Sequence, residues 1–188
     1  MKIRCKWAEE GTLLDVKYHD NEWGVPVHDD NTLFEFLLLE TAQAGLSWSI
    51  ILKKREAYRE SFDNFDVNKI AQYNQEKLQE LFLNSSIIRN KSKIQSVVKN
   101  ANAFIKVQDQ FGTFDSYLWS FVDGVPIQNQ WINYEDVPSR TKISDKLSDD
   151  LKKRSFKFVG SVTCYAIMQA IGMVNDHVTS CFRHDELR

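Results

Sequence analysis

The chain has few residues that form tight turns, and this shortage limits the folds open to it. Its 188 residues include only 7 glycines and 3 prolines. A sandwich or barrel of many short strands needs such residues at its connections. The low count therefore favours helices, and 43% hydrophobic residues supply enough apolar material for one core. We expect an all-α protein with a single domain over residues 1–188.

Apolar residues recur at helical spacing along most of the chain. The segment Leu33 to Leu39 is apolar on nearly every side and predicts a buried helix that ends near Gly45. Polar residues predicted to start or cap helices are Thr32, Ser47, Asn74, Ser116, Ser144 and Ser161. A further helix is predicted over about 89–107, after a tight turn at 85–86. Residues 1–30 and 122–143 are predicted to be irregular. The helix that begins at Ser161 is predicted to be the last long one.

The charge is distributed unevenly, although the net charge is only −2. No acidic residue lies between Glu80 and Asp109, whereas five basic residues fall there: Arg89, Lys91, Lys93, Lys99 and Lys106. A polyanion binds where basic side chains gather, so this interval is a candidate phosphate-binding surface. Two shorter basic clusters, at 53–55 and 152–157, are more typical of solvated helix faces.

The sequence also predicts where the protein works. Apolar runs such as 36–39 are far shorter than the roughly 20 residues that cross a bilayer, and the first residues lack the apolar core of a signal peptide. Three cysteines are an odd number, which argues against a disulfide framework and for free thiols or metal ligands. We expect a cytoplasmic protein in a reducing compartment, monomeric and without membrane contact.

Glu40 is a candidate functional carboxylate. It follows the apolar run 36–39 on the predicted buried helix, where an ionised carboxylate without partners is costly. A salt bridge or a cap at the helix end explains such a residue equally well. Trp48 follows after a short turn that contains Gly45, so a carboxylate and a large aromatic side chain flank this turn. A flat ligand fits between such groups.

Three large aromatic residues, Trp7, Tyr18 and Trp23, occur in the N-terminal segment that is predicted to be irregular. Rings of this size can simply dock an irregular segment on a core. Aromatic faces also bind flat and cationic rings, by stacking and by cation-π attraction of ~2 kcal/mol or more when desolvated. The three residues are therefore candidates for binding a ring-shaped ligand.

Two cysteines and two histidines near the chain ends are a suitable ligand set for tetrahedral Zn²⁺. Cys5 and His19 lie near one end, and the spacing of His177 and Cys181 near the other places both on one helical face. The pattern is weak as a motif, because the two pairs are far apart in the sequence. A Cys-His catalytic pair is an alternative without local support. The remaining residues of these types are His28, His184 and Cys164, the last more typical of a core thiol.

Six blocks of sequence follow one another along the chain: YHDNEWG at 18–24, LETAQAGLSW at 39–48, LKKREAYRESF at 52–62, SIIRNKSKI at 86–94, LWSFV at 118–122, and FKFVG to GMVNDH from 156 to 177. In this order they resemble the DNA-3-methyladenine glycosylase I family, of the helix-hairpin-helix glycosylase superfamily. The resemblance implies an all-α fold with a helix-hairpin-helix over about 75–106 and excision of alkylated purines from double-stranded DNA. It also implies one structural zinc ion that ties the two chain ends together.

The resemblance assigns residues to a base pocket. Glu40 matches the pocket carboxylate, and Tyr18 and Trp48 match the aromatic residues that stack on the excised base. Trp7 and Trp23 are the further base-binding candidates. The residues that match the four zinc ligands are Cys5, His19, His177 and Cys181.

The resemblance also assigns residues to DNA binding. Gly45 and Leu46 match the loop that enters the duplex and fills the gap left by a flipped nucleotide. The hairpin residues that would bind phosphate through backbone N–H groups and basic side chains are Ile88, Arg89, Lys91 and Lys93. Ser86 and Ser92 stand where many members carry glycine. A positive φ at Ser86 would cost ~1 kcal/mol.

The implied chemistry depends on recognition of the base. N3-methylation makes adenine cationic, so the leaving group is already activated. Our hypothesis is that Glu40 accepts a hydrogen bond from the exocyclic amine and fixes the base. Since no lysine nucleophile occurs at a matching position, we expect a monofunctional hydrolase that starts base excision repair. The alternatives are a non-catalytic helix-hairpin-helix DNA-binding protein and a zinc hydrolase, which needs an open metal position.

Overall fold

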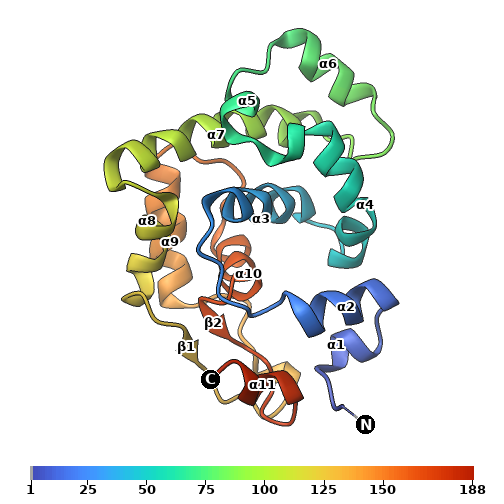
Figure 1. Cartoon of the computed structure of the whole chain (residues 1–188), viewed down its shortest axis with the longest axis vertical. Coiled ribbons are helices and arrows are strands. Elements are labelled where there is room, and N and C mark those ends of the chain that lie inside the picture. Colours follow the sequence, from blue (N-terminus) through green and yellow to red (C-terminus); the bar gives the residue numbers. More distant parts are fainter. Residues whose placement is uncertain (1) are drawn as a thin grey trace.

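The computed structural model describes residues 2–188, which are mostly helical (Figure 1). The helices are α1 (Lys6–Glu9), α2 (Leu13–Asn21), α3 (Asp30–Gln43), α4 (Trp48–Ser61), α5 (Val67–Ala71), α6 (Gln75–Leu83), α7 (Lys91–Phe111), α8 (Phe114–Trp119), α9 (Lys142–Lys153), α10 (Ser161–Ala170) and α11 (Phe182–Glu186), with 3-10 turns at Asp63–Phe65, Ser120–Val122 and Tyr134–Asp136. The strands β1 (Ile127–Gln128) and β2 (Val174–Asn175) pair in parallel, with Ile127 opposite Val174. The all-α prediction is confirmed apart from this short pairing. None of the helices within 2–188 has the length and apolarity needed to span a membrane.

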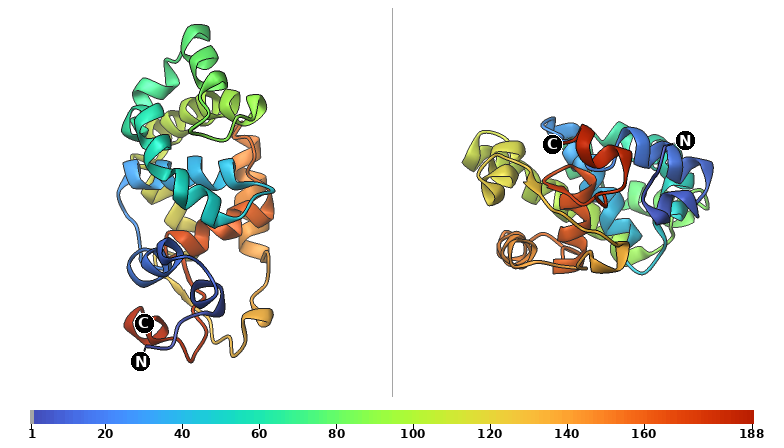
Figure 2. Two further views of the ribbon diagram at one scale, coloured as in Figure 1. Left: turned by 90° about the vertical axis from the view of Figure 1, so that its right-hand side faces the viewer. Right: turned by 90° about the horizontal axis from the view of Figure 1, so that it is seen from below.

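Helix α3 is the central element of the fold. All its residues from Leu33 to Ala42 are buried, as the apolar run predicts. Helices α4, α7, α8 and α10 pack around it, with α7 above it, α4 to its right and α10 below it in Figure 1. Helices α1, α2 and α11 form the lower end in Figures 1 and 2, where the Phe182 N–H donates to the Ile3 carbonyl at 2.9 Å.

The predicted helices are present, but three begin about one turn earlier than expected. In each helix, the side chain of the observed cap accepts a hydrogen bond from the backbone N–H of the residue that was predicted as the cap. The observed and predicted caps are Asp29 and Thr32, Thr113 and Ser116, and Thr141 and Ser144. Asn74 caps α6 as predicted, by accepting from the Lys77 N–H at 2.9 Å.

The N-terminal segment is more regular than predicted. Helices α1 and α2 occupy much of the stretch 1–30 that was expected to be irregular. A capping box holds the start of α2, where Asp15 accepts hydrogen bonds from the Thr12 N–H and hydroxyl at 2.7 and 2.6 Å. Because α2 packs on α1 and α4, tertiary contacts stabilise helices too short to be stable alone.

The C-terminal segment differs from prediction in a way that matters for the metal ligands. Helix α10 ends at Ala170. Gly172 follows with φ +73°, and a Cβ added to it would lie only 2.5 Å from backbone atoms of Val25 and Pro26, so only glycine fits there. The chain then continues as β2. His177 and Cys181 therefore lie on a turn, and the prediction that they share a helical face is wrong. The helix that begins at Ser161 is the last long one, as predicted, since only the five-residue α11 follows it.

Candidate active site and metal centre

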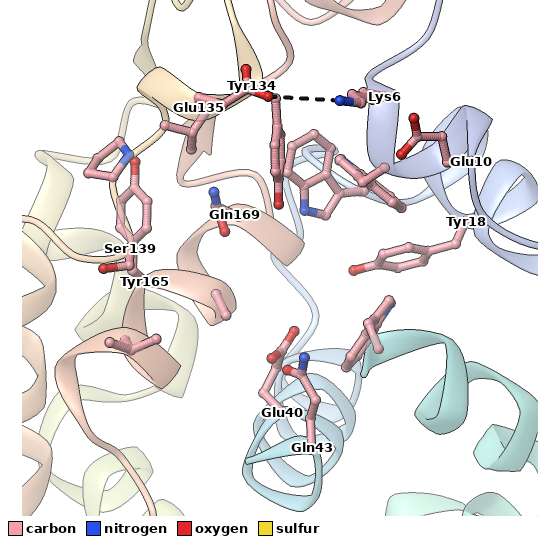
Figure 3. A pocket seen from close by; sticks show the side chains of 17 residues that line it. Lys6, Glu10, Tyr18, Glu40, Gln43, Tyr134, Glu135, Ser139, Tyr165 and Gln169 are labelled. Carbon is pink, nitrogen blue, oxygen red and sulfur yellow. Dashed lines mark ion pairs between the residues drawn. The ribbon is translucent and has the colours of Figure 1, made fainter. Parts of the chain in front are cut away.

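A pocket of about 690 Å³ opens between α1, α2, α3, α10 and the loop 134–139 (Figure 3). Figure 3 shows Glu40 and Gln43 on one wall, Tyr18 on a second, and Tyr165 and Gln169 on a third. Two aromatic walls and a carboxylate wall thus surround a space large enough for a flat ring. Three of the five predicted pocket residues, Trp7, Trp23 and Trp48, complete the lining.

Glu40 is buried and has no ionic partner among the residues that the structure describes. Its side chain lies near the end of α3 and is only 4% exposed. Among residues 2–188, its Oε2 atom has no hydrogen-bond partner. Burial raises the pKa of Glu40 to about 8, since a carboxylate loses its hydration there. The carboxyl is therefore protonated in the empty pocket at neutral pH, and a cation beside it would favour the ionised form.

This buried acid makes a testable contribution to stability. The unfolded chain ionises Glu40 at the ordinary pKa of 4.5, whereas the folded protein keeps the proton up to about pH 8. Protonation therefore stabilises the native state fully below 4.5, and this contribution is lost as the pH rises through 8. We expect Glu40→Gln to gain stability over the wild type between pH 5 and 8, by at most about 1.4 kcal/mol per pH unit. Urea unfolding of both proteins at pH 5, 6.5 and 8 measures the difference.

The comparison isolates Glu40, because all other titrating groups are present in both proteins. A difference in unfolding free energy that is flat between pH 5 and 8 would show that the native carboxyl ionises at its ordinary pKa.

Tyr18 and Trp48 meet across the pocket from α2 and the first residue of α4. Their ring centroids are 5.3 Å apart and their planes differ by 46°. The indole Nε1 of Trp48 is buried and lacks a hydrogen-bond partner within the described part of the chain. The structure thus brings Glu40, Tyr18 and Trp48 together as predicted, with two unpaired polar atoms at one site.

Trp7 and Trp23 connect this pocket to a second site. Their rings contact each other edge to face at 5.2 Å, and Trp7 also approaches Tyr18 at 6.4 Å. Trp23 packs against the His177 ring at 4.6 Å and Trp7 against the His19 ring at 5.4 Å. The pocket wall and the second site therefore share a continuous layer of rings.

The second site is the cluster of Cys5, His19, His177 and Cys181, whose ligand atoms all lie within 4.8 Å of one another. Each of the four is at most 3% exposed. The Cys181 Sγ atom is 3.4 Å from His19 Nε2 and 3.5 Å from His177 Nδ1, and Cys5 Sγ is 3.6 Å from the same Nδ1. Tetrahedral Zn²⁺, with Zn–S ~2.3 Å and Zn–N ~2.0 Å, places sulfur and nitrogen ligands about 3.5 Å apart. The cluster can therefore bind a metal ion.

The other ring nitrogen of each histidine has its own partner. Asp20 Oδ1 lies 2.9 Å from His19 Nδ1, and the Trp23 carbonyl lies 3.1 Å from His177 Nε2. Arg4 in turn donates to Asp20 at 2.7 Å. Such partners fix ring orientation and leave the remaining nitrogen unprotonated for a metal. Four buried protein ligands leave no open position, which is typical of a structural site.

The predicted DNA-binding residues lie on two neighbouring segments. Gly45 has φ +82°, which favours glycine, and Leu46 beside it is 37% exposed. In the hairpin between α6 and α7, Arg89 and Lys91 are exposed. Neither Ser86 nor Ser92 has a positive φ, so serine causes no strain at these positions.

Two of the predicted hairpin contacts have other partners. The Ile88 N–H donates to the Tyr58 hydroxyl at 3.2 Å. The Lys93 ammonium donates to the carbonyls of Ala42 and Ala44 at 2.8 and 2.6 Å. As these contacts stand, neither group is directed at a phosphate.

Twelve of the seventeen residues that line the pocket were not predicted from the sequence, among them Gln43, Tyr165 and Gln169. Gln43 follows Glu40 by one helical turn, and this spacing was an available signal. Tyr165 and Gln169, one turn apart on α10, both donate to the buried Asp176 carboxylate, at 2.7 and 2.8 Å. No local pattern indicates that this part of α10 faces Glu40, because the contact depends on how α10 packs under α3.

Comparisons with known proteins agree with this site. A family model described as methyladenine glycosylase matches residues 7–184. The chain is 46% identical to DNA-3-methyladenine glycosylase 1 of Escherichia coli (strain K12) over 95% of each chain. A crystal structure of 3-methyladenine DNA glycosylase I superposes with a TM-score of 0.91 at 48% identity, covering 96% of this chain and 98% of that one. A variant of such an enzyme in complex with 3-methyladenine superposes with a TM-score of 0.90 at 34% identity, covering 93% and 94%.

Proposed function

The chain belongs to the methyladenine glycosylase family, and on this premise we propose that it removes 3-methyladenine from double-stranded DNA as the first step of base excision repair. One observation carries the proposal for this chain. A buried carboxyl without a partner, Glu40, faces a pocket lined by the rings of Tyr18 and Trp48. Such a site suits a flat cation that has hydrogen-bond donors.

The chemistry follows from the charge of the base. The glycosidic bond breaks with its electron pair passing to the base, which neutralises the positive ring, and water adds to the sugar carbon and loses a proton. The methylated base is already a good leaving group. The protein therefore has to extrude the nucleotide, stack its ring on Tyr18 and Trp48, and hold its amine against Glu40.

The remaining predicted residues have supporting roles in this proposal. Leu46 fills the space of the extruded nucleotide, and Arg89 and Lys91 attract the phosphates on either side of the hairpin. A zinc ion bound by the cluster of Cys5, His19, His177 and Cys181 would hold α1 and α2 against the C-terminal turn. The four-ligand burial argues against the zinc hydrolase alternative.

The first test is release of free 3-methyladenine from methylated duplex DNA, separated by chromatography. We expect release without strand cleavage and without a covalent product on borohydride reduction. Of the described pocket-lining residues only Lys6 carries an amine, and it lies at the rim, 4.0 Å from Glu135 and 62% exposed. An exposed amine paired with a carboxylate lacks the desolvation that activates a lysine nucleophile.

Two results would contradict these expectations. A folded protein that binds methylated DNA but releases no base would be a non-catalytic binding protein. A borohydride-trapped complex that disappears in Lys6→Met would identify Lys6 as a nucleophile.

A further inference from the structure

Lys93 contacts the segment that carries Leu46, not only its own hairpin. It lies in the first turn of α7, and its ammonium donates to the carbonyls of Ala42 and Ala44. These carbonyls end α3, immediately before Gly45. Two of the three ammonium protons are therefore directed at backbone oxygens of what we term the Gly45 loop (residues 42–47).

The electrostatics of this contact favour a structural bond over a phosphate contact. Carbonyls at the end of a helix lack intrahelical donors and carry the negative end of the helix dipole, so a cation stabilises them. The Lys93 side chain is partly buried, and this loss of hydration lowers the pKa of its ammonium. Lys91, two residues earlier, is exposed.

A second lysine makes a reciprocal contact. Lys54, on α4 after the Gly45 loop, donates to the carbonyls of Ser85 and Ser86 at 3.4 and 2.9 Å. The hairpin thus holds the loop through Lys93, and the helix after the loop holds the hairpin turn through Lys54. The two segments are joined at both ends of the hairpin.

We propose that Lys93 is a positioning residue that fixes the Gly45 loop to the hairpin, so that Leu46 enters the duplex in register with the backbone that the hairpin holds. This inference rests on the proposed glycosylase function for its catalytic consequence. In this proposal, Lys93 acts by positioning Leu46 and makes no phosphate contact of its own.

The decisive test is a double-mutant cycle with a salt titration. Lys93→Met keeps the side-chain length and removes the ammonium. In the protein that retains Leu46, we expect Lys93→Met to lower the single-turnover excision rate about tenfold. In the Leu46→Ala background the same substitution should lower the rate less than about threefold, because the effects of coupled residues are not additive. The salt dependence of binding to undamaged duplex should stay unchanged, whereas the matched Lys91→Met should lower its slope by about 0.9, as loss of one phosphate contact does.

A third readout does not require activity. Hydrogen exchange of the amides at 43–47 should rise about tenfold in Lys93→Met, while exchange in α10 stays at the wild-type rate. That contrast separates a loosened loop from a destabilised protein.

Three results would overturn the proposal. The first is a salt slope lowered by about 0.9 in Lys93→Met, and the second is a loss of about tenfold in excision rate when Lys93→Met is added to Leu46→Ala. The third is unchanged hydrogen exchange at 43–47 in Lys93→Met. If the wild type releases no base, the glycosylase function fails, and the salt slope and hydrogen exchange still decide the role of Lys93.

Discussion

Replacement of Glu40 with glutamine should abolish base excision and leave the protein folded. The amide has nearly the same volume, so the buried site keeps its packing, but it cannot carry the negative charge that a cationic ring requires. Losing one preorganised charge-assisted hydrogen bond costs roughly 100-fold or more in rate. Single-turnover release of 3-methyladenine from methylated duplex DNA measures this loss directly.

Glu60→Gln is the matched control. Glu60 lies exposed on α4 outside the pocket, and its replacement should leave the rate within about twofold of the wild type. Excision by Glu40→Gln at the wild-type rate, with unchanged affinity for the free base, would remove Glu40 from the mechanism. The altered pH dependence of stability would still hold, since it follows from burial alone.

Replacement of Cys181 with serine should cause the largest loss of stability. Serine is a poor zinc ligand, so the variant would lose the metal ion. The ligand atoms of the three remaining residues would then be buried without the ion that they bind, which is costly. We expect the zinc content to fall from one ion per chain to nearly none and the melting temperature to fall by about 10 °C or more. Elemental analysis and thermal unfolding of the purified protein provide the two readouts. Activity per folded molecule should fall less than stability does.

Cys164→Ala is the appropriate control for the cluster. Cys164 is also fully buried, but its Sγ atom lies 3.5 Å from the Val159 carbonyl and outside the metal group. This variant should lose some packing and retain its zinc. A wild-type protein without bound zinc would contradict the metal assignment, and equal zinc loss in both variants would contradict the assigned ligand set.

The sequence predicted the helical fold well, because apolar periodicity reports burial directly. The run Leu33 to Leu39 is apolar on nearly every side, with Glu35 its one polar residue, and forms part of the central helix. Helix starts were predicted less well at three positions, since two polar residues three apart can both serve as cap. Thr113 and Ser116 are such a pair, and only the folded backbone shows which side chain accepts.

Short helices escaped prediction for a different reason. Helix α2 carries Leu13 and Leu14 on its exposed side and buries Asp15, Tyr18 and His19. Asp15 is buried because it accepts hydrogen bonds from Thr12 and Ser49, and His19 because it belongs to the metal cluster. A pattern that equates polar with exposed cannot find such a helix.

The part of the site that could be predicted from residue type alone is the buried carboxylate. Glu40 on an apolar helix was recognisable as anomalous from the sequence alone. The identity of the four cluster residues depended on family resemblance, and their placement on a turn depended on the pairing of β2 with β1. The bonds of Lys93 to Ala42 and Ala44 join residues about 50 positions apart, and no local pattern encodes them.

The cluster at the chain ends has a consequence for synthesis. Trp7 and Tyr18 are synthesised before helices α3 to α10, and His19 precedes its partner Cys181 by 162 residues. Helices α3 to α9 can collapse on one another while translation continues. Helices α1 and α2 can pack on α4 during this time, but a metal ion bound by the cluster would hold them only after Cys181 has emerged. A growing chain that binds a metal at this cluster would therefore complete the hairpin between α6 and α7 early and fix the rings of Trp7, Tyr18 and Trp23 almost last.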